Sequence, residues 1–273
     1  MSFPSLEIFH LNNLPKFRGW LRIRETVTAE HEPHHYLPLF PCLSSLKIKN
    51  CPIMSLIPVI APGSQATISS SPSLSTLSKL KSLSLCRLEE LESLPEVLLQ
   101  NLTSLETLQI WGCCELQIFM SPLLQHLTAL EDLQISNCKE LISNENKESA
   151  QCLGPTTLRY LYVLNITSLV SLPWELRHVT TLQTLDIENC PTLMSLPEWI
   201  GDFTSLSALQ IHNCPNLISL PEGMHRLTSL RHLMIMRCPR LDERCEEGTG
   251  EDWPKIAHIP NFSTRRLIFK AIG

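Results

Sequence analysis

A 24-residue motif recurs along the second half of this chain and constrains its fold more than any other feature. Three successive segments, beginning at Leu182, Leu206 and Leu230, share the frame LxxLxIxxCPxL, and the first two continue into an LPE triplet and a short linker. A unit of this length cannot bury its apolar side alone, so it is stable only when neighbouring units stack on it. The chain must therefore fold as an array of stacked units that share one core.

The spacing of the leucines in this motif is that of a leucine-rich repeat. We count nine units, which open at Leu6 (a degenerate copy), Leu43, Leu80, Leu105, Leu130, Leu158, Leu182, Leu206 and Leu230. The sequence predicts an α/β fold: a leucine-rich-repeat solenoid with a parallel sheet on its concave side and short helical or irregular segments on its convex side. Strands pack about 4.8 Å apart and helices roughly 8–10 Å apart, so the stack should curve into a horseshoe or arc.

The unit that opens at Leu206 shows which side chains should face the core. Leu209 and Ile211 alternate with Ala208, Gln210 and His212, which is the period of a β-strand. The two apolar residues are expected to point inward, and the other three toward solvent on the concave face.

We interpret residues 1–273 as one leucine-rich-repeat domain, because a solenoid lengthens by adding repeats in one direction and does not need to split into two domains as it grows. Long inserts are expected at 18–42, 55–79 and 142–157, and a closing segment at 242–273. The chain starts inside a degenerate repeat, and no polar cap precedes it. It is therefore expected to be a C-terminal fragment or the product of a truncated gene.

Charge and hydropathy exclude several classes of partner. The net charge of −5 lacks the basic footprint of a nucleic-acid-binding protein, and no apolar run approaches the roughly 20 residues of a membrane span. The first residues, MSFPSLEIFH, do not resemble a secretory signal. These observations predict a protein of the cytoplasm, with the nucleus as the alternative location, that neither binds nucleic acid nor inserts into a membrane.

No catalytic or cofactor motif stands out from the background. The chain has no GxSxG, no phosphate-binding loop and no paired CxxC spacing, so we expect no enzyme activity, no cofactor, no metal and no small-molecule substrate. His31, His34 and His35 form a cluster, but Pro33 breaks the helix that a zinc-binding HExxH motif requires. A solvated loop is the preferred interpretation, and an adventitious metal site is the alternative.

Six cysteines occupy the same position of the repeat: Cys51, Cys113, Cys138, Cys190, Cys214 and Cys238. A buried thiol serves as a small hydrophobic group and weak hydrogen-bond donor. We predict that these six, which we call the cysteine ladder, are buried, reduced and metal-free. Cys114 should face away from the core.

Several segments resemble the C-terminal leucine-rich repeats of plant nucleotide-binding disease-resistance proteins of the coiled-coil class. They are LPKFRGW (14–20), FPCLSSLKIKNCPIM (40–54), SLPEWIGDFTSL (195–206), SLPEGMHRLTSL (219–230) and the ending CEEGTGEDWPKIAHIPNF (245–262). Secreted plant repeats usually carry an LxGxIP turn, which this chain replaces with SLPE or SLPW. Members of the family also carry a nucleotide-binding switch, but this chain has no GxxxxGK[ST], so that activity is not transferred to it.

The resemblance implies two roles for the repeats of an innate immune receptor. They recognise a pathogen effector or a modified host protein, and they help to hold the receptor inactive by packing against its own nucleotide-binding domain. The alternative is an intracellular adaptor, such as the substrate-binding repeats of a ubiquitin ligase, also without enzyme activity.

Either role would use the outward positions of the strands. The candidate partner-binding residues on the concave face are Lys47, Lys49, Gln109, Trp111, Gln134, Tyr160, Tyr162, Leu164, Asp186, Glu188, Gln210, His212, Met234 and Met236. Aromatic residues and methionine are enriched at the cores of interfaces. Two explanations are open for the large ones: they contact a partner, or an insert such as 142–157 folds over Tyr160 and covers them.

Overall fold

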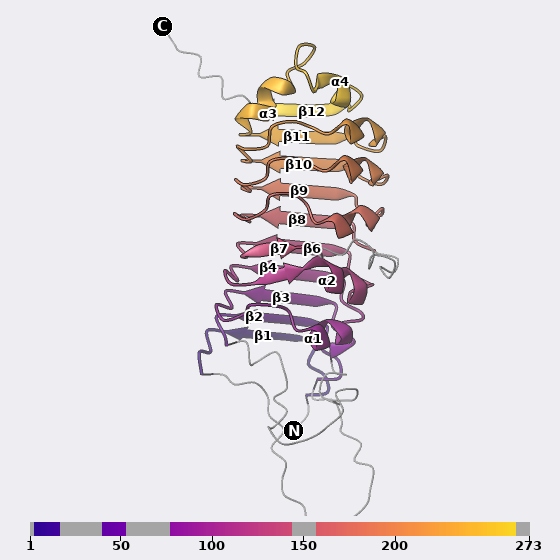
Figure 1. Ribbon diagram of the computed structural model, residues 1–273. Helices are drawn as coiled ribbons and strands as arrows, with labels where there is room; N and C mark the ends of the chain where they lie inside the picture. Colours follow the sequence, from indigo (N-terminus) through magenta and orange to yellow (C-terminus); the bar gives the residue numbers. More distant parts are fainter. Residues whose placement is uncertain (1–2, 17–39, 53–76, 144–156, 266–273) are drawn as a thin grey trace, which may run out of the picture.

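The structure, a computed structural model, describes residues 3–16, 40–52, 77–143 and 157–265. Ten parallel strands stack into one sheet along the length of the molecule, each beside its neighbour in chain order (Figure 1). The predicted leucine-rich-repeat solenoid is thereby confirmed. The histidine cluster at 31–35 and most of the three predicted inserts lie outside the described residues.

The strands of the main sheet are all five residues long. The first nine begin two residues after the leucine that opens each predicted unit, so the sequence register was correct. They are β1 (Ile8–Asn12), β2 (Ser45–Lys49), β3 (Ser82–Cys86), β4 (Thr107–Trp111), β6 (Asp132–Ser136), β8 (Tyr160–Leu164), β9 (Thr184–Glu188), β10 (Ala208–His212), β11 (His232–Met236) and β12 (Asn261–Arg265).

Short helices and a second, small sheet form the other side of the stack. The helices are α1 (Glu96–Asn101), α2 (Met120–His126), α3 (Pro239–Arg244) and α4 (Trp253–Ile256), with the 3₁₀ helices η5 (Trp174–His178), η6 (Glu198–Asp202) and η7 (Glu222–Arg226). Strands β5 (Gln117–Phe119) and β7 (Glu140–Ile142) pair in parallel. Across the described part of the chain, no helix has both the length and the apolar character needed to cross a bilayer.

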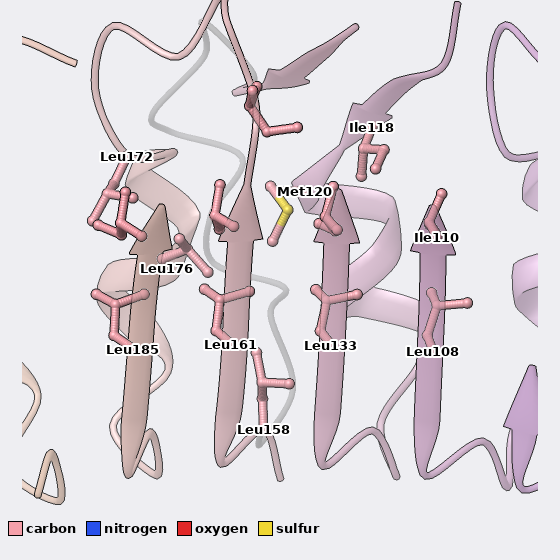
Figure 2. Close-up of a cluster of buried hydrophobic side chains, with 14 of the residues drawn as sticks. Leu108, Ile110, Ile118, Met120, Leu133, Leu158, Leu161, Leu172, Leu176 and Leu185 are labelled. Atoms are coloured by element: carbon pink, nitrogen blue, oxygen red, sulfur yellow. The ribbon is translucent and has the colours of Figure 1, made fainter. Parts of the chain in front are cut away.

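The core consists of leucine rows that run perpendicular to the strands. Leu108, Leu133, Leu161 and Leu185 occupy matched positions on β4, β6, β8 and β9, and each is at most 1% exposed (Figure 2). The same alternation holds in β10, where Leu209 is fully buried. Each unit thus buries its apolar side against both neighbours, which is why none is stable alone.

Each of the first nine strands of the main sheet is followed directly by a residue with positive φ, most often asparagine. Asn189 and Asn213, for example, have φ of 55° and 51°. Asparagine tolerates this left-handed conformation better than most residues. The Asn213 side-chain amide donates to Oδ1 of Asn189 at 2.6 Å, so the turns of neighbouring repeats are also bonded to one another. The positive φ and the bonds between neighbouring turns explain why asparagine precedes most cysteines of the ladder.

Two features differ from the sequence prediction. The main sheet has ten strands rather than nine, because the closing segment adds β12, whose Phe262 and Thr264 align with Leu233 and Ile235 of β11. The pairing of β5 with β7 was not predicted, since three-residue strands carry little alternation to detect.

The closing segment covers the end of the core. Three of its apolar side chains, from Cys245, Ile256 and Ile259, are at most 5% exposed. The terminal unit of a solenoid otherwise exposes its apolar face to water, so a cap is required for solubility.

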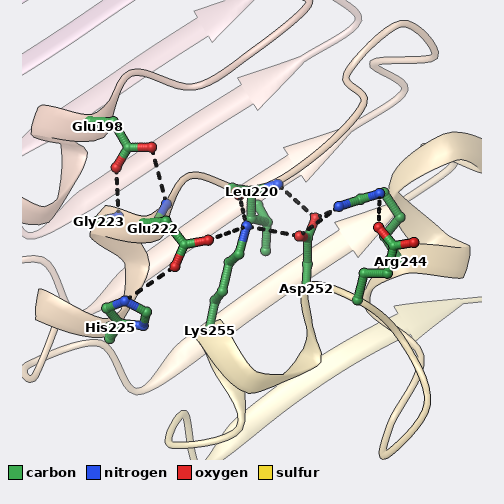
Figure 3. Close-up of polar contacts among 9 residues, drawn as sticks. Glu198, Leu220, Glu222, Gly223, His225, Arg244, Asp252 and Lys255 are labelled. Atoms are coloured by element: carbon green, nitrogen blue, oxygen red, sulfur yellow. Dashed lines mark hydrogen bonds and ion pairs between the residues drawn. The ribbon is translucent and has the colours of Figure 1, made fainter.

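A buried carboxylate attaches this cap to the repeat before it (Figure 3). Asp252, which is fully buried, accepts hydrogen bonds from the backbone N–H of Leu220 at 2.9 Å, from Arg244 Nε at 3.1 Å and from Lys255 Nζ at 2.9 Å. Lys255 also donates to the carbonyl of Leu220 at 2.6 Å and pairs with Glu222 at 3.1 Å. The cap is therefore held by charged contacts as well as by apolar ones.

All six cysteines of the ladder are buried, as predicted, with exposed fractions of at most 5%. Their thiols donate to main-chain carbonyls: Cys190 to Val163 and Cys238 to Ile211, both at 3.8 Å. Cys114 is exposed, also as predicted. Burial raises the pKa of Cys113 to about 11, whereas the thiol of Cys214 lowers the pKa of Cys190.

We expect a thiol-specific reagent to label the exposed Cys42 and Cys114 quickly and the ladder only after denaturation. Burial blocks access of the reagent, and a raised pKa also reduces the reactive thiolate. Mass spectrometry of the labelled peptides before and after denaturation measures this. Cys190 tests protection by burial most stringently, because its lowered pKa favours the reactive thiolate. Rapid labelling of Cys190, a disulfide between Cys190 and Cys214, or stoichiometric zinc would contradict the prediction.

Candidate functional site

The fourteen candidate residues all lie on strands of the main sheet, at positions that alternate with core residues. Because the strands pair without slippage, these positions form three rows across the sheet. The central row holds Lys47, Gln109, Gln134, Tyr162, Asp186, Gln210 and Met234. The row at the strand ends holds Lys49, Trp111, Leu164, Glu188, His212 and Met236, and the row at the strand starts holds Tyr160.

The large apolar groups on this face are only partly covered. Trp111 is 46% exposed and Met234 is 36% exposed. Tyr160, Tyr162 and Leu164, which lie together on β8, are half-buried by neighbouring strands. Residues 144–156 are not described, so the predicted cover over Tyr160 lies outside the structure described here. Side chains of this kind stabilise an interface when a partner buries them.

The middle of the concave face is acidic. Asp132 on β6 and Asp186 and Glu188 on β9 flank the tyrosines of β8. Asp132 was not among the predicted residues, although its position in the strand, two before Gln134 on the same face, could have identified it. Gln134 Nε2 donates to Asp132 Oδ1 at 3.1 Å, and Gln109 Nε2 donates to Gln134 Oε1 at 3.3 Å.

The electrostatic environment of these groups is unusual for a surface. Burial raises the pKa of Asp132, although the hydrogen bond from Gln134 opposes the shift. Burial also raises the pKa of Asp186, His212 lowers it, and Glu188 raises it. The pKa of Tyr162 is raised by burial and by the charges of Asp132 and Asp186. The carboxylates of Asp132 and Asp186 are therefore partly removed from water.

The basic residues of the concave face lie apart from this acidic region. Lys47 and Lys49 are on β2, which β3 and β4 separate from β6. The face thus has a basic end and an acidic middle, which can orient a charged partner.

Other sites for chemistry are few in the described part of the chain. No group of three or more His, Cys, Asp or Glu there has the arrangement to hold a metal ion. A shallow pocket of about 290 Å³ lies away from the concave face, beside β7. Its lining includes Leu141, Val170 and Trp174.

Comparison with known sequences identifies the family. The sequence model of the family described as "Plant disease resistance protein RPS2-like, leucine-rich repeats" matches residues 94–239, more than half of the chain. The chain belongs to this family. No curated protein sequence matches it.

Solved structures agree with the fold of this RPS2-like repeat array. The leucine-rich repeat domain of the type III effector XopL is similar with a TM-score of 0.52 and 23% identity, over 74% of this chain and 63% of that one. The Leptospira interrogans leucine-rich repeat protein LIC12759 has a TM-score of 0.52 and 16% identity, over 82% of this chain and 56% of that one. This chain thus spans less than two thirds of either structure. A repeat scaffold of this kind is typically a surface for protein–protein interaction.

Proposed function

We propose that this chain is the recognition and regulatory leucine-rich-repeat region of a plant innate immune receptor of the nucleotide-binding, coiled-coil class. It acts without enzyme activity, in the cytoplasm. Its partners are a pathogen effector or a modified host protein and the receptor's own nucleotide-binding domain. We also propose that its repeats and closing segment work as one domain.

The concave face carries this proposal. Within the repeat frame the inward residues are almost uniform, whereas the outward residues are chemically varied and include Lys47, Trp111, Tyr162, Asp186 and Met234. A surface that served only to keep the solenoid soluble would not need exposed tryptophan and methionine. Family membership supports the immune role, since the RPS2-like repeats are those of disease-resistance proteins.

The test changes Trp111 to Ala, Tyr162 to Ala and Asp186 to Lys together, in a full-length receptor that carries these repeats. We expect the loss of two aromatic side chains that a partner would bury, together with a charge reversal, to weaken partner binding by about 100-fold or more, since hot-spot residues contribute about 2 kcal/mol or more each. Effector-triggered cell death in leaf tissue should disappear, or cell death should begin without an effector if autoinhibition is lost.

The matched control replaces Val170, Met194 and Ile218 with Ala. These three side chains are 56%, 54% and 41% exposed but lie outside the strands of the main sheet. The control should leave recognition and autoinhibition intact. If the concave variant folds and retains both activities, or if only the control loses them, the concave face is not the working surface.

A further inference from the structure

In the part of the chain that the structure describes, no lysine or arginine forms an ion pair with Asp132, Asp186 or Glu188, the three carboxylates in the middle of the concave face. Oδ1 of Asp186 and Nε2 of His212 are both shielded from water, and neither has a hydrogen-bond partner among the described residues. A carboxylate that is partly removed from water and incompletely bonded costs free energy unless a donor reaches it.

Aromatic rings lie next to these carboxylates. In the central row Tyr162 pairs directly with Asp186, and in the row of strand starts Tyr160 pairs with Asp132. Both tyrosines are half-buried. A ring face beside a carboxylate is a favourable environment for a guanidinium or ammonium group, which stacks on the ring and donates to the carboxylate.

The surrounding charges exclude the opposite kind of ligand. Burial, and after it the charges of Asp132 and Asp186, raise the pKa of Tyr162. These two carboxylates lie on the strands that flank Tyr162, and their negative charge repels phosphate groups. The residues also lack the arrangement needed to hold a metal ion, within the part of the chain that the structure describes.

We propose that the acidic–aromatic patch, formed by Asp132, Tyr160, Tyr162, Asp186 and Glu188, receives an arginine or lysine side chain of the protein partner. This inference rests on the proposed function, because it specifies the chemistry of the partner that the concave face binds. Arginine suits the patch better than lysine, since its planar group can stack on Tyr162 while it donates two parallel hydrogen bonds to one carboxylate.

A pair of tripeptides tests the proposal directly on this chain. The probe is acetyl-Ser-Arg-Ser-amide, and its neutral counterpart carries citrulline, which has nearly the same shape without the charge. Each is titrated into the isotopically labelled protein while the backbone amide resonances are recorded by NMR. We expect the arginine peptide to shift the resonances of Tyr162, Asp186 and Glu188, with affinity about tenfold or more above that of the citrulline peptide.

Variants that replace carboxylates with neutral amides identify which side chains bind the charged peptide. Asp186→Asn with Glu188→Gln should abolish the difference between the two peptides. Glu89→Gln with Glu90→Gln, which changes the net charge equally at two exposed positions outside the patch, should preserve it. Raising the salt concentration should weaken the arginine peptide selectively, because it screens exposed charges.

Three results would overturn the proposal: equal shifts with both peptides, shifts that map outside the patch, or no shifts with either. Each of these results can be distinguished from failure of the proposed function. If the receptor loses recognition when Trp111, Tyr162 and Asp186 are changed but the tripeptides do not distinguish charge, the concave face binds its partner through other chemistry. If the tripeptides bind as expected but the receptor variant keeps its activities, the patch binds cations and the immune role is wrong.

Discussion

Replacing Leu209 with alanine is expected to lower the free energy of unfolding by about 2–5 kcal/mol. Leu209 is fully buried in the middle of β10, and its neighbours in the leucine row, Leu185 and Leu233, are at most 1% exposed. Removing the side chain loses its transfer free energy and leaves a cavity that strands on both sides cannot close, because the sheet register fixes their positions.

Urea unfolding followed by circular dichroism measures this loss. The matched control is Ile218→Ala in the same repeat, where the aliphatic side chain is 41% exposed and the expected cost is below about 1 kcal/mol. Equal costs for the two variants would mean that the strand register is wrong, since a one-residue slip exchanges core and solvent positions.

Replacing Asp252 with alanine is expected to lower the free energy of unfolding by about 3–5 kcal/mol, the usual cost of removing one partner from a buried ion pair. The change leaves the N–H of Leu220 without its acceptor and Lys255, which is only 14% exposed at its side chain, without its buried counter-charge. The cap over the terminal core should loosen first, because a solenoid holds each unit only through its neighbours.

Hydrogen exchange at the amides of β11 and β12, together with urea unfolding, measures the effect. Glu251→Ala is the matched control: Glu251 also pairs with Arg244, but its side chain is 74% exposed, so the expected cost is below about 1 kcal/mol. A similar loss in both variants would show that the buried network does not hold the cap.

The same carboxylate predicts an acid sensitivity. Burial alone would raise the pKa of Asp252, but the hydrogen bonds from Arg244, Leu220 and Lys255 outweigh it, and the pKa is lowered. A lowered pKa contributes stability that is complete above the ordinary value of about 3.9 and is lost as the pH falls through the folded value. The cap should therefore loosen below about pH 4 in the native protein. In Asp252→Asn that part of the pH dependence should be absent.

Much of the fold follows from the repeat alone. The leucines that open the nine units fix where each strand begins, and the alternation of Leu209 and Ile211 with Gln210 fixes which face is buried. Both signals are local and are repeated many times, so they agree with one another. The burial of the cysteine ladder was predictable for the same reason.

The closing segment was harder to interpret. Phe262 and Thr264 of β12 occupy the places of Leu233 and Ile235, and the buried Ile259 precedes the strand by two residues, but no leucine marks these positions. Nothing in the order of residues pairs Asp252 with the N–H of Leu220, 32 residues earlier. These contacts exist because no repeat follows the last unit. Its apolar core and the edge of its strand would otherwise face water, so the closing segment packs over both.

The candidate site, like the fold, has features that the sequence predicts and others that depend on the folded structure. Strand periodicity alone predicts which residues point away from the core, because successive side chains of a strand lie on opposite faces of the sheet. That Asp132, Tyr162 and Asp186 form one patch follows from the folded structure, since they come from three different repeats. Parallel pairing brings such positions to adjacent strands about 4.8 Å apart, whatever the length of chain between them.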